Sequence, residues 1–209
     1  MRIKAFAFNP LQVNTYVVYD ESGECIIIDP ACSDNRENNE LESFITEKSL
    51  TPKMVIATHF HFDHLMGASF VCKTYNLELA GHKNFSIYWD KFGVTTQTQS
   101  FGFSMDSPPK PTIILDNDSV IRFGNSSLIV MHLPGHSICS IGLYSEKNNI
   151  LFTGDVLFKM GYGRTDLPGG DYESLMHSIT KKIFTLDHST AIYPGHGPSS
   201  HIYQEINNF

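Results

Sequence analysis

The sequence predicts a mixed α/β or α+β fold, and two features of the 209-residue chain indicate it. Short apolar runs typical of strands alternate with turn residues, and amphipathic helical segments lie among them in both halves of the chain. Hydrophobic residues make up 41% of the chain, which is enough for a sizeable core. No repeat or linker divides the sequence, so we expect a single domain spanning residues 1–209.

Strands are predicted where a short run rich in aromatic or β-branched residues lies between turn signals. In chain order these runs are residues 5–8, 15–20, 25–28, 54–57, 77–80, 112–115, 119–123, 127–133, 141–144, 150–153 and 191–193. Helices are predicted where apolar side chains recur at helical spacing, at residues 39–50, 65–75 and 172–183. Asp171 is a suitable N-cap for the last helix. Pro52 should end the first, because proline disfavours helical geometry in the residue before it.

Residues 83–111 show no clear periodicity. The polar run at residues 95–100 and three prolines near the end of the segment predict a loop or a partly helical excursion. Long excursions in compact domains are often functional. This one either shapes a pocket or is a variable surface insertion, and the sequence leaves both interpretations open.

Charge and cysteine content narrow the class of protein. The formal net charge of −7 disfavours binding to a phosphate backbone. The cysteines form no CxxC pair, and we expect reduced thiols at Cys25, Cys32, Cys72 and Cys139. The N-terminus lacks the apolar core of a signal peptide, and no apolar run approaches the roughly 18 residues of a membrane span. We therefore expect a cytoplasmic protein with no nucleic-acid or membrane partner, and the oligomeric state is left open.

Five of the ten histidines follow strand-like runs, together with two aspartates. The seven candidate metal ligands are His59, His61, Asp63, His64, His136, Asp155 and His196. Four strand ends would bring them together, and rigid strands hold such a site more precisely than long loops do. A lone histidine is more often a surface or core residue than a ligand. We interpret the remaining histidines in that way: His82, His132, His177, His188 and His201.

The spacing of the first four ligands suggests two adjacent metal ions. His59 and His61 are two residues apart, so in extended backbone they project to the same side and can bind one ion. Asp63 and His64 begin a turn and can bind its neighbour. Imidazole and carboxylate suit zinc, iron or manganese, and seven protein ligands are too many for one tetrahedral ion. We therefore expect two divalent ions, with zinc the first choice. A metal pair about 3.5–4 Å apart can generate hydroxide near neutral pH.

As a set, these motifs resemble the metallo-β-lactamase superfamily, and most closely its small glyoxalase II-like hydrolases. The motifs that carry the resemblance are Asn14–Tyr16, Asp29–Pro30, Thr58–His64, Pro134–His136, Gly154–Asp155, Gly163–Asp171 and Pro194–Gly197. The resemblance covers nearly the whole chain. It implies a four-layer αββα sandwich with two metals at one edge, between the sheets.

The resemblance also implies a role for each ligand. One metal would be bound by His59, His61 and His136, and the other by Asp63, His64 and His196, with Asp155 bridging them. Asp29 would order the metal-binding loop through outer hydrogen bonds. The implied reaction is hydrolysis of a small thioester such as S-lactoylglutathione by a metal-activated hydroxide. Asp63 and Asp155 are the expected catalytic carboxylates, and Asp63 would orient the attacking water.

Several alternatives stay open. Arg164 could bind a substrate carboxylate, or it could pair with Asp166 and brace its loop.

The sequence ends soon after His196, without the helical extension that helps full-length glyoxalase II enzymes bind glutathione. Persulfide dioxygenases share these ligand motifs but use a single iron. Other superfamily hydrolases are weaker alternatives: lactonases, phosphodiesterases and β-lactamases, the best-known of which have cysteine where Asp155 stands. A non-catalytic metal-binding module is disfavoured, because open coordination is the usual mark of a catalytic site.

Overall fold

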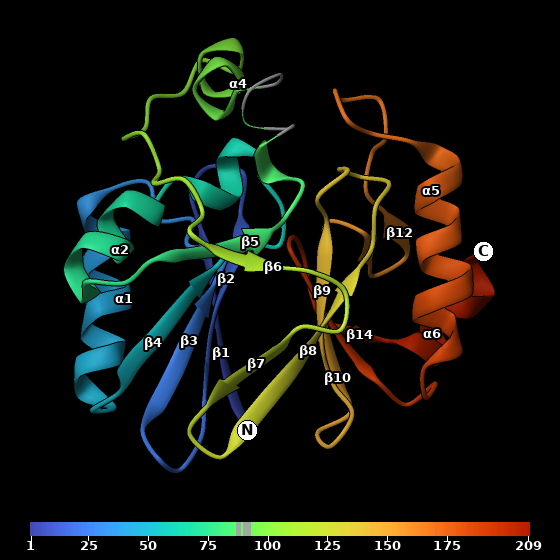
Figure 1. Ribbon diagram of the computed structural model, residues 1–209, viewed down its shortest axis with the longest axis horizontal. Helices are drawn as coiled ribbons and strands as arrows, with labels where there is room; N and C mark the ends of the chain where they lie inside the picture. The colour runs from blue at the N-terminus through green and yellow to red at the C-terminus, as the bar shows by residue number, and fades with distance from the viewer. Residues whose placement is uncertain (87–88, 90–92) are drawn as a thin grey trace.

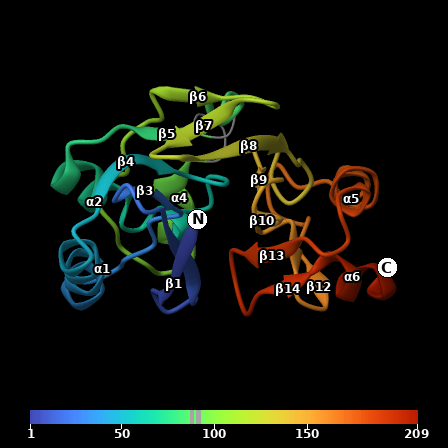
Figure 2. The ribbon, with the colours of Figure 1, turned by 90° about the horizontal axis from the view of Figure 1, so that it is seen from below.

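Two six-stranded sheets lie face to face in the described part of the chain, with helices on the outer face of each (Figures 1 and 2). The computed structural model describes residues 1–86, 89 and 93–209, without the side chains of residues 95–97. Helices α1 (Asn35–Glu47) and α2 (Ala68–Tyr75) cover the first sheet, and α5 (Tyr172–His177) and α6 (Ile202–Glu205) lie beside the second. The predicted four-layer αββα sandwich is confirmed.

Both sheets contain the strands that the sequence predicts. The first sheet is formed, in this spatial order, by β1 (Arg2–Phe8), β2 (Val13–Tyr19), β3 (Glu24–Ile28), β4 (Thr51–Ile56), β5 (Leu79–His82) and β6 (Ile113–Leu115). The second has the order β14-β13-β10-β9-β8-β7, and its strands are β7 (Val120–Phe123), β8 (Ser126–His132), β9 (Ile141–Ser145), β10 (Ile150–Gly154), β13 (Ala191–Pro194) and β14 (Ser200–His201). A short ribbon pairs β11 (Leu157–Phe158) with β12 (Gly161–Tyr162). The sequence pattern did not predict the two-residue strands β11, β12 and β14.

Strand β3 shows how the layers are held together. Ile26 and Ile28 pack between the two sheets, whereas Cys25 and Ile27 pack on the side of α1 and α2. Successive side chains of a strand point to opposite faces, and both faces are covered here. From Cys25 to Ile28 the strand is therefore continuously apolar instead of alternating with polar residues. A third apolar cluster, which includes Leu175 of α5, joins that helix to the second sheet.

The first helix begins and ends earlier than predicted. It begins at Asn35 because the Asp34 side chain accepts a hydrogen bond from the backbone N of Glu37 and caps the N-terminus. Just beyond its end, Ser49 has a φ of +52°, and the chain reverses there. Pro52 therefore does not end the helix, and it lies in β4 instead.

The other two predicted helices change type along their length. The second is a 3₁₀ turn at Phe62–Leu65 followed by α2. Gly67 separates the two, where an added Cβ would press against the backbone of Cys32. The third is α-helical only as far as the end of α5 and continues as a π turn at Ser178–Lys182 and a 3₁₀ turn at Ile183–Thr185. Apolar periodicity locates these helices but does not resolve such changes in hydrogen-bond pattern.

The excursion at residues 83–111 is partly helical, with α4 at Val94–Ser100. In Figure 1 this helix lies beyond the strand ends, at the top of the molecule. The part of the prediction that concerns residues 87, 88 and 90–92 lies outside the described residues.

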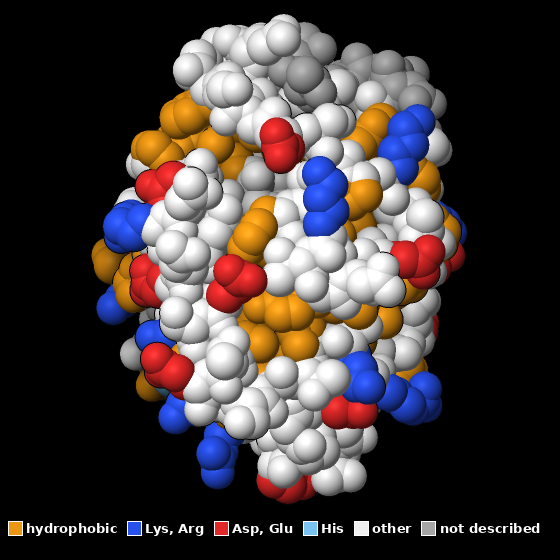
Figure 3. Space-filling model, turned by 90° about the vertical axis from the view of Figure 1, so that its left-hand side faces the viewer, with side chains coloured by type: hydrophobic (Ala, Val, Ile, Leu, Met, Phe, Trp, Pro, Cys, Tyr) orange, Lys and Arg blue, Asp and Glu red, His pale blue; other side chains and the backbone are white. Residues whose placement is uncertain are grey.

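The surface over α1 and α2 carries acidic and basic side chains intermixed, as Figure 3 shows. The four cysteines are all free, as the sequence predicts, and all four are buried. Among the helices of the described residues, none is both long and apolar enough to cross a membrane.

Candidate metal centre

The predicted ligands follow the carboxyl ends of four strands. The segment His59–His64 follows β4, whereas His136, Asp155 and His196 follow β8, β10 and β13. Strand β10 is parallel to β13 and antiparallel to β9, which is itself antiparallel to β8. Three ligand-bearing strands of the second sheet therefore run in one direction, and their carboxyl ends meet at one edge, next to the loop after β4.

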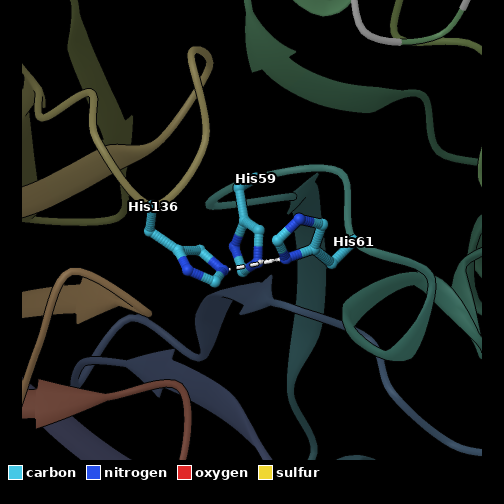
Figure 4. A group of neighbouring side chains, drawn as sticks. All are labelled: His59, His61 and His136. Carbon is cyan, nitrogen blue, oxygen red and sulfur yellow. Dashed lines mark hydrogen bonds between the residues drawn. The ribbon is translucent and has the colours of Figure 1, made fainter. Parts of the chain in front are cut away.

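Three histidines converge at this edge (Figure 4). The Nδ1 atom of His61 lies 3.1 Å from Nε2 of His59 and 2.8 Å from Nε2 of His136. All three side chains are buried. The two-residue spacing of His59 and His61 places them together, as predicted, and the turn after β8 brings the third ring to the same point.

A second group lies beside the first. Oδ2 of Asp63 is 3.8 Å from Nε2 of His64 and 3.4 Å from Nε2 of His196. The Asp155 carboxylate stands between the groups. Its Oδ1 is 3.3 Å from Nε2 of His64, and its Oδ2 is 3.4 Å from Nε2 of His196 and 3.7 Å from Nε2 of His136. One carboxylate thus reaches both sets of ligand atoms.

Two of the rings are held from their far side by backbone carbonyls. Nδ1 of His136 is 2.7 Å from the carbonyl oxygen of Arg164, and Nδ1 of His196 is 3.0 Å from that of Leu11. A carbonyl can only accept, so each Nδ1 carries the proton and each Nε2 presents a lone pair to the centre.

Asp29 orients two further rings. Its Oδ2 accepts hydrogen bonds from Nδ1 of His64 at 3.0 Å and from Oγ1 of Thr58 at 2.7 Å, and its Oδ1 accepts from the backbone N of Thr58 at 2.7 Å. The Thr58 hydroxyl in turn lies 3.1 Å from Nδ1 of His59. Asp29 has a φ of +49°, a left-handed conformation that aspartate tolerates better than most residues. These contacts match the outer role that the resemblance implies for Asp29.

The turn that carries His196 is held by residues whose function the sequence pattern did not indicate. Nδ2 of Asn14 donates to the carbonyl oxygens of Pro194 at 3.0 Å and Gly197 at 2.8 Å. The Tyr16 hydroxyl donates to the same Pro194 oxygen at 2.6 Å. The only signal in the sequence was the Asn14–Tyr16 motif, which marked the family without saying what these side chains contact.

Arg164 forms a two-pronged ion pair with Asp166. Both N–O distances, from Nε to Oδ1 and from Nη2 to Oδ2, are 2.6 Å. Of the two interpretations of Arg164, the geometry favours the one in which it braces its loop.

The other five histidines lie outside the two groups, and His82 and His132 stack with ring centroids 4.0 Å apart.

Burial and charge set the protonation of the centre. Burial lowers the pKa of His59 well below its usual value and that of His61 to about 3, so both rings stay neutral. Burial also opposes protonation of His64, but the neighbouring carboxylates outweigh it and raise its pKa well above the usual value. Burial alone would raise the pKa of Asp155, yet the charge of His64 holds it well below the ordinary range. Without metal, a proton on His64 therefore balances the carboxylates.

The donor set fits divalent cations. Zinc–nitrogen bonds of about 2.0–2.1 Å in a tetrahedron place ligand atoms about 3.4 Å apart, close to the carboxylate–imidazole distances in the second group. Nε2 of His64 and Oδ1 of Asp155 are buried and face each other at 3.3 Å, and neither makes a hydrogen bond of regular geometry. A buried polar atom of this kind is costly unless something binds it. Together the two groups and Asp155 offer imidazole and carboxylate ligands, which is the chemistry that zinc, iron and manganese accept.

A cavity of about 230 Å³ opens onto both groups. Its lining residues are Leu11, His61, Phe62, Asp63, Phe101, His136, Asp155, Arg164, Leu167 and His196. A substrate can therefore reach the ligand atoms from solvent. Such access is typical of catalytic metal sites, whereas structural sites are closed by protein ligands.

The family model of the metallo-beta-lactamase superfamily matches residues 8–196. The chain belongs to this superfamily. Hydroxyacylglutathione hydrolase GloC of Haemophilus influenzae is 32% identical over 98% of this chain and 95% of its own length. The crystal structure of the BLEG-1 B3 metallo-beta-lactamase is 32% identical, with a TM-score of 0.89 over 99% of this chain and 97% of the other. TTHA1623, solved in a di-iron-bound form, is 30% identical, with a TM-score of 0.86 over 98% of each chain.

The match to this superfamily, together with the histidine–aspartate cluster, identifies a metal-dependent hydrolase with the metallo-beta-lactamase fold. The resemblance stated from the sequence is confirmed.

Replacing Asp29 tests whether outer hydrogen bonds hold the centre. In Asp29→Asn the amide NH2 replaces one carboxylate oxygen and faces either the backbone N–H of Thr58 or the donors of His64 and the Thr58 hydroxyl, so an acceptor that holds the loop is lost in either orientation. We expect zinc affinity to fall about 10–100-fold, measured by competition with a chromophoric chelator. Asp118→Asn is the matched control, because Asp118 also has a positive φ but lies exposed in the turn before β7. Equal affinities in the two variants would contradict the role of Asp29.

Metal binding should release protons. The pKa of His64 is raised in the metal-free centre, so a proton competes with the cation wherever the pH lies below that raised value. Zinc affinity should therefore rise, by about tenfold or more, between pH 6 and pH 8. Calorimetric titrations in buffers of different ionisation enthalpy measure both the affinity and the protons released. An affinity that does not change over this range would contradict the assigned protonation.

Proposed function

We propose that this protein hydrolyses small thioesters, and that S-lactoylglutathione is the first substrate to test. The observation that carries the proposal is the pair of ligand groups that share Asp155 beside an open cavity. The similarity to hydroxyacylglutathione hydrolase GloC over nearly the full length of both proteins supports the choice of a thioester.

In this proposal His59, His61 and His136 would hold one divalent ion, and Asp63, His64 and His196 would hold a second, with the Asp155 carboxylate within reach of both. When bound, such a pair supplies hydroxide at neutral pH and polarises a carbonyl oxygen. Zinc is our first choice, and iron is the second because TTHA1623 has a di-iron-bound form.

The chain's own residues orient the reactants. Asp63 lines the cavity and is ionised, since the charge of His64 outweighs the effect of burial and lowers its pKa. Its carboxylate can accept a hydrogen bond from the attacking water and so fix the direction of attack. The ligand rings are kept in place, while the thioester bond breaks, by Asp29, Thr58 and the backbone carbonyl groups that accept hydrogen bonds from the histidines.

Hydrolysis of a β-lactam is the second candidate. The B3 metallo-beta-lactamase structure favours it, because it matches this chain over its full length at 32% identity. The amide carbonyl of a β-lactam would approach the same pair of ligand groups. The two candidates differ in the leaving group, which is a thiolate in one and a ring nitrogen in the other.

The test compares thioester and β-lactam substrates on the protein reconstituted with zinc or iron. We expect release of glutathione from S-lactoylglutathione, with kcat/KM reduced more than about 100-fold in His61→Ala. The control is His177→Ala, which alters an exposed histidine of α5.

Three other results would overturn this proposal. Cleavage of nitrocefin without cleavage of thioesters would assign the protein to the β-lactamases. One iron per chain with oxygen consumption on glutathione persulfide would assign it to the dioxygenases. Full thioesterase activity in His61→Ala would place the chemistry elsewhere in the molecule.

A further inference from the structure

Three apolar side chains from separate loops surround the mouth of the cavity. Leu11 lies between β1 and β2, Phe101 follows α4, and Leu167 lies between β12 and α5. Leu11 is 40% exposed and Phe101 is 51% exposed, although both are large hydrophobic residues. The floor beneath them is polar, because it consists of the histidines and aspartates of the two ligand groups. An apolar rim above a few polar groups is typical of a site that binds part of a small molecule.

Phe101 is held in its exposed position by neighbouring aromatic rings. It stacks on Phe62 with ring centroids 5.4 Å apart and planes 25° apart, and Phe103 lies 5.5 Å from the same ring. Phe62 is buried at 4% exposure, directly between His61 and Asp63 in the chain. The turn after α4 is fixed by the hydrogen bond from the backbone N of Phe103 to the carbonyl oxygen of Thr98. Phe101, just after α4, thus supplies part of the cavity wall.

The charges around the cavity leave little to attract an anionic substituent. Among the described residues that line it, Arg164 is the one lysine or arginine, and both prongs of its guanidinium contact Asp166. The other charged lining groups include the carboxylates of Asp63 and Asp155. Apolar contact with the rim is therefore the main attraction available to the part of a substrate next to the scissile bond.

We propose that the Phe62–Phe101 wall binds an apolar substituent of the thioester, preferably an aromatic one, and so determines specificity. This inference rests on the proposed thioesterase function. Stacked and edge-on contacts with two phenylalanine rings favour an aromatic group over a methyl group. The structure therefore points to aromatic or bulky acyl thioesters as better substrates than S-lactoylglutathione.

The test uses two pairs of substrates that differ by one phenyl group. S-mandeloylglutathione carries a phenyl where S-lactoylglutathione has a methyl, with the same thiol. S-phenyl thioacetate and S-ethyl thioacetate place the difference on the thiol side instead, and that pair is corrected for the uncatalysed rates. We expect wild-type kcat/KM to favour the phenyl member by about tenfold or more in at least one pair. In Phe101→Ala that preference should fall by about tenfold, whereas Phe101→Leu should keep part of it.

The matched control is Tyr203→Ala, which removes an equally exposed aromatic ring, 52% exposed, that does not line the cavity. It should preserve the wild-type preference. A wild-type enzyme that hydrolyses all four thioesters without preference would overturn this inference and leave the proposed function standing. Equal loss on both members of each pair in Phe101→Ala would also overturn it, since the ring would then only support the fold. Failure to hydrolyse any thioester would overturn the proposed function itself.

Discussion

Side chains that bind metal must be held close together even though, without the metal, their lone pairs face one another. In this protein Nδ1 of His61 lies within 3.1 Å of two other ring nitrogens, and Asp63 and Asp155 both border His64 and His196. Such an arrangement persists only if the surrounding structure fixes each ligand from outside. The direction of the strands and the outer hydrogen bonds meet this requirement together.

The two sheets make different contributions to the site. The first sheet supplies the loop after β4, and Asp29 at the end of β3 holds that loop through Thr58 and His64. The second sheet supplies three strand ends that run in one direction, each followed by one ligand. Asn14 and Tyr16 of β2 hold the Pro194–Gly197 turn, so the first sheet also positions His196. The site depends on the contact between the sheets, because neither sheet carries a full set of ligands.

Local pattern predicted a mixed α/β fold and the clustering of the ligands, whereas the four-layer arrangement was implied by the resemblance to the superfamily. His59 and His61 are neighbours in an extended segment, and the later ligands each follow an apolar run. The carbonyl partners of His136 and His196 could not be predicted in this way, because every residue has a backbone carbonyl and only the fold selects Arg164 and Leu11. Likewise, the stacking of Phe101 on Phe62 joins residues 39 positions apart, which no periodicity reveals. The ends of α1 depend on single residues, the N-cap Asp34 and the positive-φ residue Ser49, which the apolar periodicity used to place the helix does not register.

The most direct test of the account is the metal content of the reconstituted protein, measured by mass spectrometry of the elements in wild type, His61→Ala and His196→Ala. Each variant removes a ligand from only one of the two groups. We expect about two ions per chain in the wild type and about one in each variant. One ion per wild-type chain, lost entirely in both variants, would show that the seven side chains form a single site and would contradict it.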